Sequence, residues 1–233
     1  MWLHGFTQTR DSAGRFRSIL AGGREVWTLD LPGHGTACEI AASLDETADL
    51  VADLLPDEPV DLAGYSLGGR VALHVALRHE ARVRRLVVLG ATRGLATAPE
   101  RAERRRHDEA LADHIEAVGT DEFLDEWLAL PLFATLPADP IERAVRSHDA
   151  AGLANSLRCS GTGTQAWLAP LLAGLATPTL ALAGSLDAKF ADEARDLART
   201  IGHGSVALVE GAGHAAHLEA PDACADLVAG FCD

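Results

Sequence analysis

The chain has 233 residues, of which 48% are hydrophobic, and it carries a formal net charge of −14 at pH 7. That length fits one α/β domain with room for an inserted subdomain, and the hydrophobic fraction is enough for a substantial core. The excess of acidic residues argues against nucleic acid and anionic membrane surfaces as partners, because both require basic patches.

The sequence has no apolar run of about 18 residues, which membrane insertion would require. It also does not open on a charged segment followed by an apolar leader. The spacing of the four cysteines is typical neither of a metal site nor of a redox pair; they are Cys38, Cys159, Cys224 and Cys232. We therefore expect reduced thiols in a cytoplasmic protein.

Six segments rich in β-branched and aliphatic residues, with turn residues at their ends, predict strands. They lie near residues 1–4, 25–30, 60–64, 85–90, 178–183 and 205–209. Helices are predicted between and after them, over residues 45–55, 67–79, 192–200 and 221–231. Ser43 and Glu46 form a capping box at the start of the first of these helices. Such alternation predicts a mostly parallel sheet with helices on both faces.

Residues 97–165 break this alternation and predict four helices, near residues 99–118, 121–130, 140–148 and 152–159. An insertion at the carboxyl ends of parallel strands lies where such sheets bind ligands. We therefore expect a core of residues 1–96 and 166–233, with residues 97–165 as a helical cap over the active site.

The sequence Gly64-Tyr65-Ser66-Leu67-Gly68 joins a predicted strand directly to a predicted helix. A sharp turn of this kind at Gly-x-Ser-x-Gly is the nucleophile elbow of the α/β-hydrolase fold, which exposes the serine hydroxyl. The flanking glycines are needed because a Cβ there would collide with neighbouring backbone. A chance glycine-rich turn is the alternative, so the motif needs support from other segments.

One such segment is His4-Gly5-Phe6, which follows the first predicted strand. In this fold a His-Gly-x loop supplies one backbone N–H of the oxyanion hole, and the residue after the nucleophile supplies the other. Phe6 and Leu67 are therefore the expected donors.

The other two segments follow the last two predicted strands and carry Asp187 and His214. Taken singly, Asp187 could be a helix cap or a loop acid, and His214 could be a solvated loop histidine. The order Ser66, Asp187, His214 is the one that the α/β-hydrolase fold uses. Together the three residues predict a Ser-His-Asp catalytic triad.

On a narrower scale the chain resembles the 2-succinyl-6-hydroxy-2,4-cyclohexadiene-1-carboxylate synthase family of menaquinone biosynthesis. The matching segments run over nearly the whole chain: Leu3-His-Gly-Phe6, Asp30-Leu-Pro-Gly-His-Gly35, Gly64-Tyr-Ser-Leu-Gly-Gly-Arg-Val-Ala72, Arg101-Ala-Glu-Arg104, Trp127, Pro131-Leu-Phe133, Arg146-Ser147, Gly161-Thr-Gly-Thr-Gln165, Asp187-Ala-Lys-Phe190 and Gly213-His-Ala-Ala-His217. The chain departs from the family in lacking two strands before the His-Gly loop. We expect either a shortened start or a reduced version of the fold with a sheet of about six strands, in which the strand around residues 26–29 becomes an edge.

The resemblance implies a lyase that expels pyruvate from an enolpyruvyl cyclohexene with three carboxylates, without a cofactor. Its site needs fixed cations, and arginine pairs bidentately with carboxylate. The resemblance places the substrate-binding set at Tyr65, Arg70, Arg104, Trp127, Arg146 and Lys189. Each has an ordinary alternative: a solvated helix face for the arginines, a surface position for Lys189, and packing for the two aromatic residues.

The implied mechanism is that Asp187 orients His214, which draws the proton from Ser66. The serine oxygen, or the serine and histidine together, then abstracts a carbon-bound proton, while the N–H groups of Phe6 and Leu67 stabilise the enolate. The same residues would also suit a serine hydrolase of an ester, thioester or carbon–carbon bond, or a ligand receptor on a hydrolase scaffold. His214 and His217 have no third ligand nearby in sequence, so no metal is expected.

Overall fold

The computed structural model describes all residues, 1–233. It contains one six-stranded sheet in the order β2-β1-β3-β4-β5-β6, in which every pairing is parallel. The strands are β1 (Trp2–Leu3), β2 (Thr28–Leu29), β3 (Val60–Tyr65), β4 (Val83–Leu89), β5 (Thr179–Gly184) and β6 (Gly204–Val209). The predicted fold class is confirmed, and the strand from the segment 25–30 lies at the edge as expected.

Eleven α-helices accompany the strands: α1 (Gly14–Leu20), α2 (Leu44–Asp53), α3 (Leu67–Arg78), α4 (Ala98–Val118), α5 (Thr120–Leu128), α6 (Pro140–Ala144), α7 (Ala150–Ser160), α8 (Ala169–Leu172), α9 (Ala188–Thr200), α10 (Ala216–Glu219) and α11 (Pro221–Cys232). The sequence did not predict α1, α8 and α10, which are too short for a clear apolar periodicity. None of the helices combines the length and apolar content needed to cross a bilayer.

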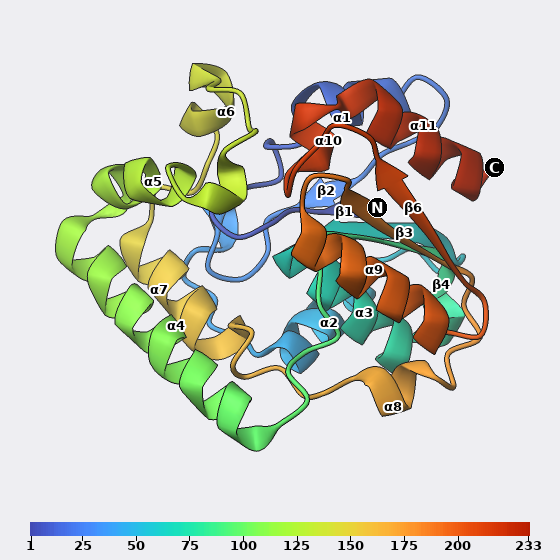
Figure 1. Ribbon diagram of the computed structural model, residues 1–233, viewed down its shortest axis with the longest axis horizontal. Helices are drawn as coiled ribbons and strands as arrows, with labels where there is room; N and C mark the ends of the chain where they lie inside the picture. The colour runs from blue at the N-terminus through green and yellow to red at the C-terminus, as the bar shows by residue number, and fades with distance from the viewer.

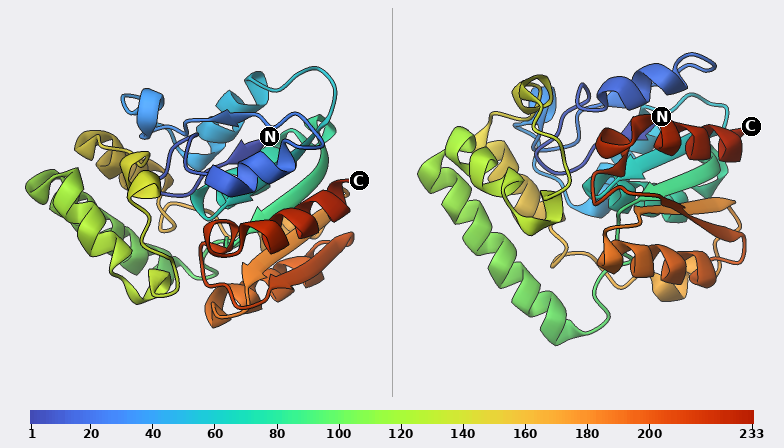
Figure 2. Two further views of the ribbon diagram at one scale, coloured as in Figure 1. Left: turned by 90° about the horizontal axis from the view of Figure 1, so that it is seen from above. Right: turned by 45° about the horizontal axis from the view of Figure 1, so that its top comes forward.

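Helices cover both faces of the sheet, as Figure 2 shows. On one face, α2, α3 and α9 bury side chains such as Val51, Leu73 and Leu197 in a single apolar cluster with the strands. On the other face, α1 and α11 bury Phe16 and Val228 against the alternate side chains of the same strands. Both faces of the sheet are therefore covered by helices. The carboxyl ends of the strands are left open.

Helices α4 to α7 lie together on one side of the sheet, separate from the helices that cover its faces (Figure 1). They have their own small apolar cluster, to which α4, α5 and α7 contribute Ile115, Phe123 and Leu153. These helices all fall within residues 97–165. The division of the chain into a core and a cap at those boundaries stays a prediction.

Two helices differ from their predicted bounds for local reasons. Helix α9 begins at Ala188 and not near residue 192, because the Asp187 side chain accepts a hydrogen bond from Phe190 N and caps the helix. Helix α6 ends at Ala144 and not near residue 148. The residues that follow it form hydrogen bonds to the loop after β1 instead of continuing the helix.

The capping box at α2 gives a direct test of local stability. Ser43 Oγ accepts from Glu46 N, and the Glu46 carboxylate accepts from Ser43 N, as the sequence predicted. We expect Ser43→Ala to lower the free energy of unfolding by about 1 kcal/mol, because one helix N–H loses its acceptor. Urea unfolding measures this, with Ser43→Thr as the control that keeps the cap. Equal stability of the alanine variant would contradict the expectation.

Candidate active site

The nucleophile elbow lies between β3 and α3. Ser66 has φ 52° and ψ −108°, a strained conformation for a residue with a side chain. A Cβ on Gly64 would come within 2.2 Å of Gly68 O, and one on Gly68 within 2.3 Å of Leu3 O. The two glycines therefore allow the strand, the turn and the helix to approach this closely, and they leave the Ser66 hydroxyl at the end of the sheet.

Three side chains from distant parts of the sequence form a hydrogen-bonded chain at this point. His214 Nε2 lies 3.4 Å from Ser66 Oγ, and His214 Nδ1 lies 2.8 Å from Asp187 Oδ2. The side chains of His214 and Asp187 are only 3% and 8% exposed. The loops after β3, β5 and β6 thus bring together the serine, the acid and the histidine that the sequence singled out.

The loop after β1 lies against the elbow. A tight turn closes it, with Gly5 N donating to Gln8 Oε1 and Gln8 N donating to Gly5 O. Gly68 N donates to His4 O over 3.0 Å, which ties this loop to the first turn of α3. The loop therefore has a fixed position relative to Ser66.

Two backbone N–H groups remain available beside Ser66. Phe6 N donates to no group of the protein. Leu67 is the first residue of α3, where an N–H has no intrahelical acceptor. Phe6 and Leu67 line the same cavity as Ser66, as an oxyanion hole requires.

Two buried histidines support this loop. His4 Nε2 accepts a hydrogen bond from Leu31 N, and the His4 and His34 rings lie 5.0 Å apart in an edge-to-face contact. Burial lowers the pKa of His4 to about 4 and that of His34 to about 3. Both are therefore neutral at pH 7 and shape the loop through packing and hydrogen bonds.

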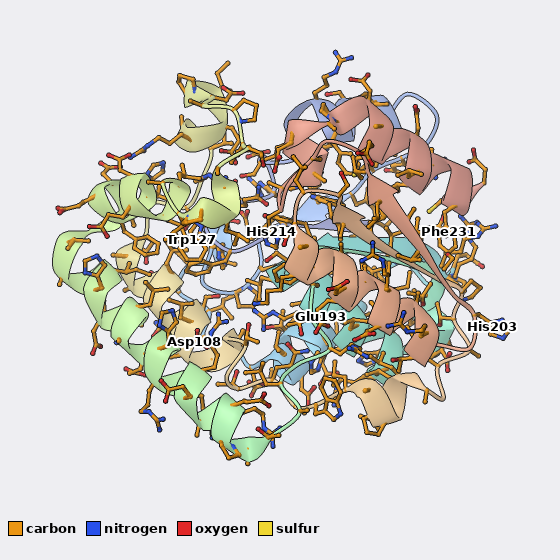
Figure 3. The ribbon with its side chains drawn as sticks, in the orientation of Figure 1. Asp108, Trp127, Glu193, His203, His214 and Phe231 are labelled. Atoms are coloured by element: carbon orange, nitrogen blue, oxygen red, sulfur yellow. The ribbon has the colours of Figure 1, made fainter.

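A cavity of about 280 Å³ lies over Ser66, between the strand ends and the helices α4, α5 and α7. In Figure 3, Trp127 on α5 and His214 on the loop after β6 mark the two sides that line it. Of the predicted substrate-binding residues, five line this cavity: Tyr65, Arg70, Arg104, Trp127 and Lys189. The cavity is therefore cationic on several sides, within a chain that is strongly acidic overall.

Arg70 is the most unusual of these residues. It is 9% exposed, and its guanidinium donates only to uncharged groups, Ser160 O at 2.8 Å and Gln165 Oε1 at 3.5 Å. Burial, together with the nearby charge of Arg104, lowers the pKa of Arg70 to about 10. It stays charged at pH 7 with no carboxylate partner, and a buried charge of that kind favours binding of an anion.

Arg104 is held from its own helix. Its Nε donates to Asp108 Oδ1 over 2.7 Å, a pairing at spacing i, i+4. The Asp108 side chain is 3% exposed and also accepts from Gly163 N, so it joins α4 to the loop 161–165 that holds Arg70. One buried carboxylate thereby helps to fix both cationic side chains.

The other three residues have mixed surroundings. Lys189 is exposed at the start of α9, so it lies at the mouth of the cavity. Trp127 is half-buried and packs edge-to-face on Phe6, with ring centroids 5.3 Å apart. Tyr65 is buried, with its ring against Gly5 and 4.4 Å from the His217 ring. Packing and cavity lining are therefore combined in both aromatic residues.

Arg146 is not among the residues that line the cavity, and its place in the substrate-binding set stays a prediction. Its guanidinium is buried and contacts Glu142 and, in the loop after β1, Thr7. Helix α6 ends at Ala144, and Ser147 N then donates to Thr7 O in the loop after β1.

The structure also adds residues that the sequence reasoning missed. His107 and Thr162 line the cavity, and Asp108 holds Arg104. The spacing of Arg104 and Asp108 on a predicted helix was a usable signal for the ion pair. Nothing in the sequence pattern marked His107 or Thr162 as facing the cavity.

A family model described as the Alpha/beta hydrolase family matches residues 1–227. A 2-succinyl-6-hydroxy-2,4-cyclohexadiene-1-carboxylate synthase of Serratia proteamaculans is 32% identical over 242 residues, covering 99% of this chain and 91% of the relative. A synthase of the same name from Klebsiella pneumoniae is 33% identical over 230 residues, covering 96% of this chain and 89% of the relative.

Among solved structures, MenH from S. aureus is similar with a TM-score of 0.92 at 31% identity, covering 99% of this chain and 91% of that one. A thermophilic esterase from Thermogutta terrifontis has a TM-score of 0.82 at 23% identity over 99% and 87% of the two chains, which shows the shared fold alone. The chain belongs to the alpha/beta hydrolase family and, within it, to the family of the 2-succinyl-6-hydroxy-2,4-cyclohexadiene-1-carboxylate synthases.

Proposed function

We propose that this protein is a lyase of menaquinone biosynthesis that eliminates pyruvate. Its substrate is 2-succinyl-5-enolpyruvyl-6-hydroxy-3-cyclohexene-1-carboxylate, and its product is 2-succinyl-6-hydroxy-2,4-cyclohexadiene-1-carboxylate. The relatives that span nearly the whole chain carry the name of this reaction product's synthase. Within the structure, the proposal rests on one cavity. Ser66 and His214 line it together with the buried Arg70, whose guanidinium has no carboxylate partner in the protein.

The cations suit a substrate with three carboxylates. Arg70 has no carboxylate partner in the protein, and Arg104 shares only the buried Asp108. Lys189 stands at the mouth of the same cavity. Charge-assisted hydrogen bonds from these groups would hold the substrate and favour the departure of an anionic leaving group. A simple ester has no need of several fixed cations.

We propose that the Ser-His-Asp group acts as a proton-transfer unit. Asp187 holds His214 in the tautomer that accepts a proton from Ser66, and Ser66 Oγ takes the proton beside the succinyl carbonyl. The electron pair moves onto the carbonyl oxygen, where the N–H groups of Phe6 and Leu67 face the growing charge. Collapse of the enolate then breaks the carbon–oxygen bond to the enolpyruvyl group.

The steps balance without a cofactor. The enolpyruvate that leaves takes up a proton and becomes pyruvate, while the ring gains the second double bond of the conjugated diene. The proton on His214 supplies what the leaving group takes up. No electron donor or acceptor is consumed.

The decisive experiment is pyruvate release from the enolpyruvyl cyclohexene by the wild-type protein, followed by reduction of pyruvate with lactate dehydrogenase and NADH. Appearance of the diene absorbance at the same rate is the expected result. Ser66→Ala is the control for contaminating activity. Turnover of simple esters together with no pyruvate release would overturn the lyase assignment in favour of a serine hydrolase.

Arg70 offers a test of substrate binding. We expect Arg70→Met to raise KM by about 10- to 100-fold, because a charge-assisted hydrogen bond to a carboxylate is lost. Folding should be little affected, since methionine fills a similar space without a buried charge. Steady-state pyruvate release measures the change. The control is Arg78→Met on the same helix, whose arginine pairs with Asp49 at the surface; an equal KM in both variants would contradict the expectation.

A further inference from the structure

The segment just after α6 is fastened to the loop that carries Phe6. Thr9 Oγ1 donates to Val145 O over 2.5 Å, and Ser147 N donates to Thr7 O over 2.8 Å. Between these two contacts, Arg146 Nη1 donates to Thr7 Oγ1 over 2.5 Å. Three consecutive residues of the inserted helical region thus contact the oxyanion loop, although more than 130 residues separate them in sequence.

Arg146 is itself held rigidly. Its Nε donates to Glu142 Oε2 over 2.9 Å, and its Nη2 lies 2.6 Å from Glu142 Oε1 in an ion pair. The side chains are 2% and 12% exposed, so this ion pair is almost completely buried. The third guanidinium nitrogen is left for Thr7. The geometry is that of a fixed support and not of a group that waits for a ligand.

Thr7 needs such a support. Its φ is 67°, in the left-handed region that a β-branched residue seldom adopts. A strained residue persists only where its surroundings hold it. Here both the hydroxyl and the carbonyl of Thr7 are held by the segment after α6. Thr7 directly follows Phe6, so anchoring Thr7 helps to fix the backbone of Phe6 and, with it, the free Phe6 N–H.

We propose that Arg146, fixed by Glu142, is a positioning residue that holds Thr7 and thereby aims the Phe6 N–H at the oxyanion. The inference rests on the proposed function, but it concerns the rate of the chemical step and not substrate binding. An oxyanion-hole donor must lie within hydrogen-bond distance of the growing charge, and losing one costs on the order of 10²-fold in rate. Misplacing it should cost a substantial part of that factor.

Thr7→Val tests the hydroxyl contact alone, because valine is β-branched like threonine and imposes the same backbone strain. We expect kcat for pyruvate release to fall by about tenfold with KM unchanged, since only the transition state uses the oxyanion hole. Thr7→Ser keeps the hydroxyl and should restore most of the rate. Arg146→Lys, whose single ammonium cannot pair with Glu142 and also reach Thr7, should behave like Thr7→Val.

A second readout separates this inference from the proposed function. A fluorophosphonate phosphonylates Ser66 with loss of fluoride, and its P=O oxygen occupies the oxyanion hole in doing so. Thr7→Val and Arg146→Lys should therefore slow the labelling of Ser66, whether or not the wild-type protein releases pyruvate. Thermal unfolding and titration of active sites give the fraction of folded protein in each variant, and the labelling rates of both variants are corrected for it.

Unchanged labelling and unchanged kcat in Thr7→Val would overturn the inference. So would a rise in KM without a fall in kcat for Arg146→Lys, which is the signature of an arginine that binds the substrate. Failure of the wild-type protein to release pyruvate, with labelling still slowed in both variants, would overturn the proposed function and leave the positioning role supported.

Discussion

Pyruvate release by Ser66→Ala is expected to be slower than that of the wild-type protein by a factor on the order of 10⁴ or more. The reason is geometric. His214 Nε2 lies 3.4 Å from Ser66 Oγ, and both side chains line the cavity, so the serine oxygen can pass a proton to the imidazole. Without that oxygen the imidazole has no intermediate through which to take the carbon-bound proton, although the oxyanion donors and the cations stay in place.

A matched control comes from the same cavity. Ser156 also lines it, and its hydroxyl makes no hydrogen bond to the protein, so Ser156→Ala should change kcat little. A loss of less than tenfold in Ser66→Ala would show that Ser66 is not the base. Mass spectrometry of the wild-type protein during turnover settles the remaining chemistry. An acyl adduct on Ser66 would mean that the serine attacks a carbonyl, as in a hydrolase.

The chemistry at the strand ends could be read from the sequence because it depends on local rules. A Cβ on Gly64 or Gly68 would collide with backbone atoms, so the Gly-x-Ser-x-Gly pattern by itself predicts the geometry of the elbow. Asp187 and His214 each follow a strand of a parallel sheet, and the carboxyl ends of parallel strands meet at one edge. Their meeting with Ser66 follows from the order of the strands.

Arg146 could not be placed in the same way. The resemblance to the synthase family singled it out as a cation, but its orientation depends on contacts with Thr7, 139 positions away. The partner Glu142 lies at spacing i, i+4, which favours an ion pair on a helix, yet α6 ends before Arg146. A sequence pattern gives the charge of a residue and its spacing from a partner. The direction of its side chain depends on tertiary contacts, which the pattern does not contain.

Arg70 and Arg104 illustrate the opposite case. The charge run around Arg104 and the helical position of Arg70 each suggested a solvated face as the alternative. The structure shows Arg70 buried on a helix that packs on the sheet, with Arg104 held by a buried carboxylate. The decisive fact is burial, and burial of a single polar position within an amphipathic helix is not visible in its periodicity.

Acid unfolding should be steep, because three histidines are completely enclosed. His4, His34 and His217 are at most 1% exposed. Burial is the main cause that lowers their pKa values, to about 4 for His4 and about 3 for the other two. Next to burial, the charge of Arg146 lowers the pKa of His217, whereas Asp30 acts in the opposite sense on the other two.

The sign of the effect follows from proton binding. Between pH 6.5 and the folded-state pKa values, the unfolded chain protonates these histidines and the folded protein does not. Above about pH 6.5 these histidines are neutral in both states and do not change the free energy of unfolding with pH. Below that value the free energy of unfolding falls as the pH is lowered. Each histidine contributes a loss of about 2 kcal/mol by pH 5, so the three together remove about 6 kcal/mol. That loss is comparable with the whole stability of an ordinary domain, so unfolding near pH 5 is expected.

Urea unfolding at a series of pH values measures the slope of the free energy of unfolding against pH. Between pH 6 and 5 this slope should correspond to the uptake of about three protons when the protein unfolds. His217→Phe should lower that uptake by about one, because a phenyl ring can pack between Trp2 and Tyr65 as the imidazole does, without a titrating group. His203→Gln is the control, since His203 is exposed at the far end of the sheet from the cavity (Figure 3). An unfolding free energy that stays level from pH 6.5 to 5 would mean that the buried imidazoles accept protons within the folded protein.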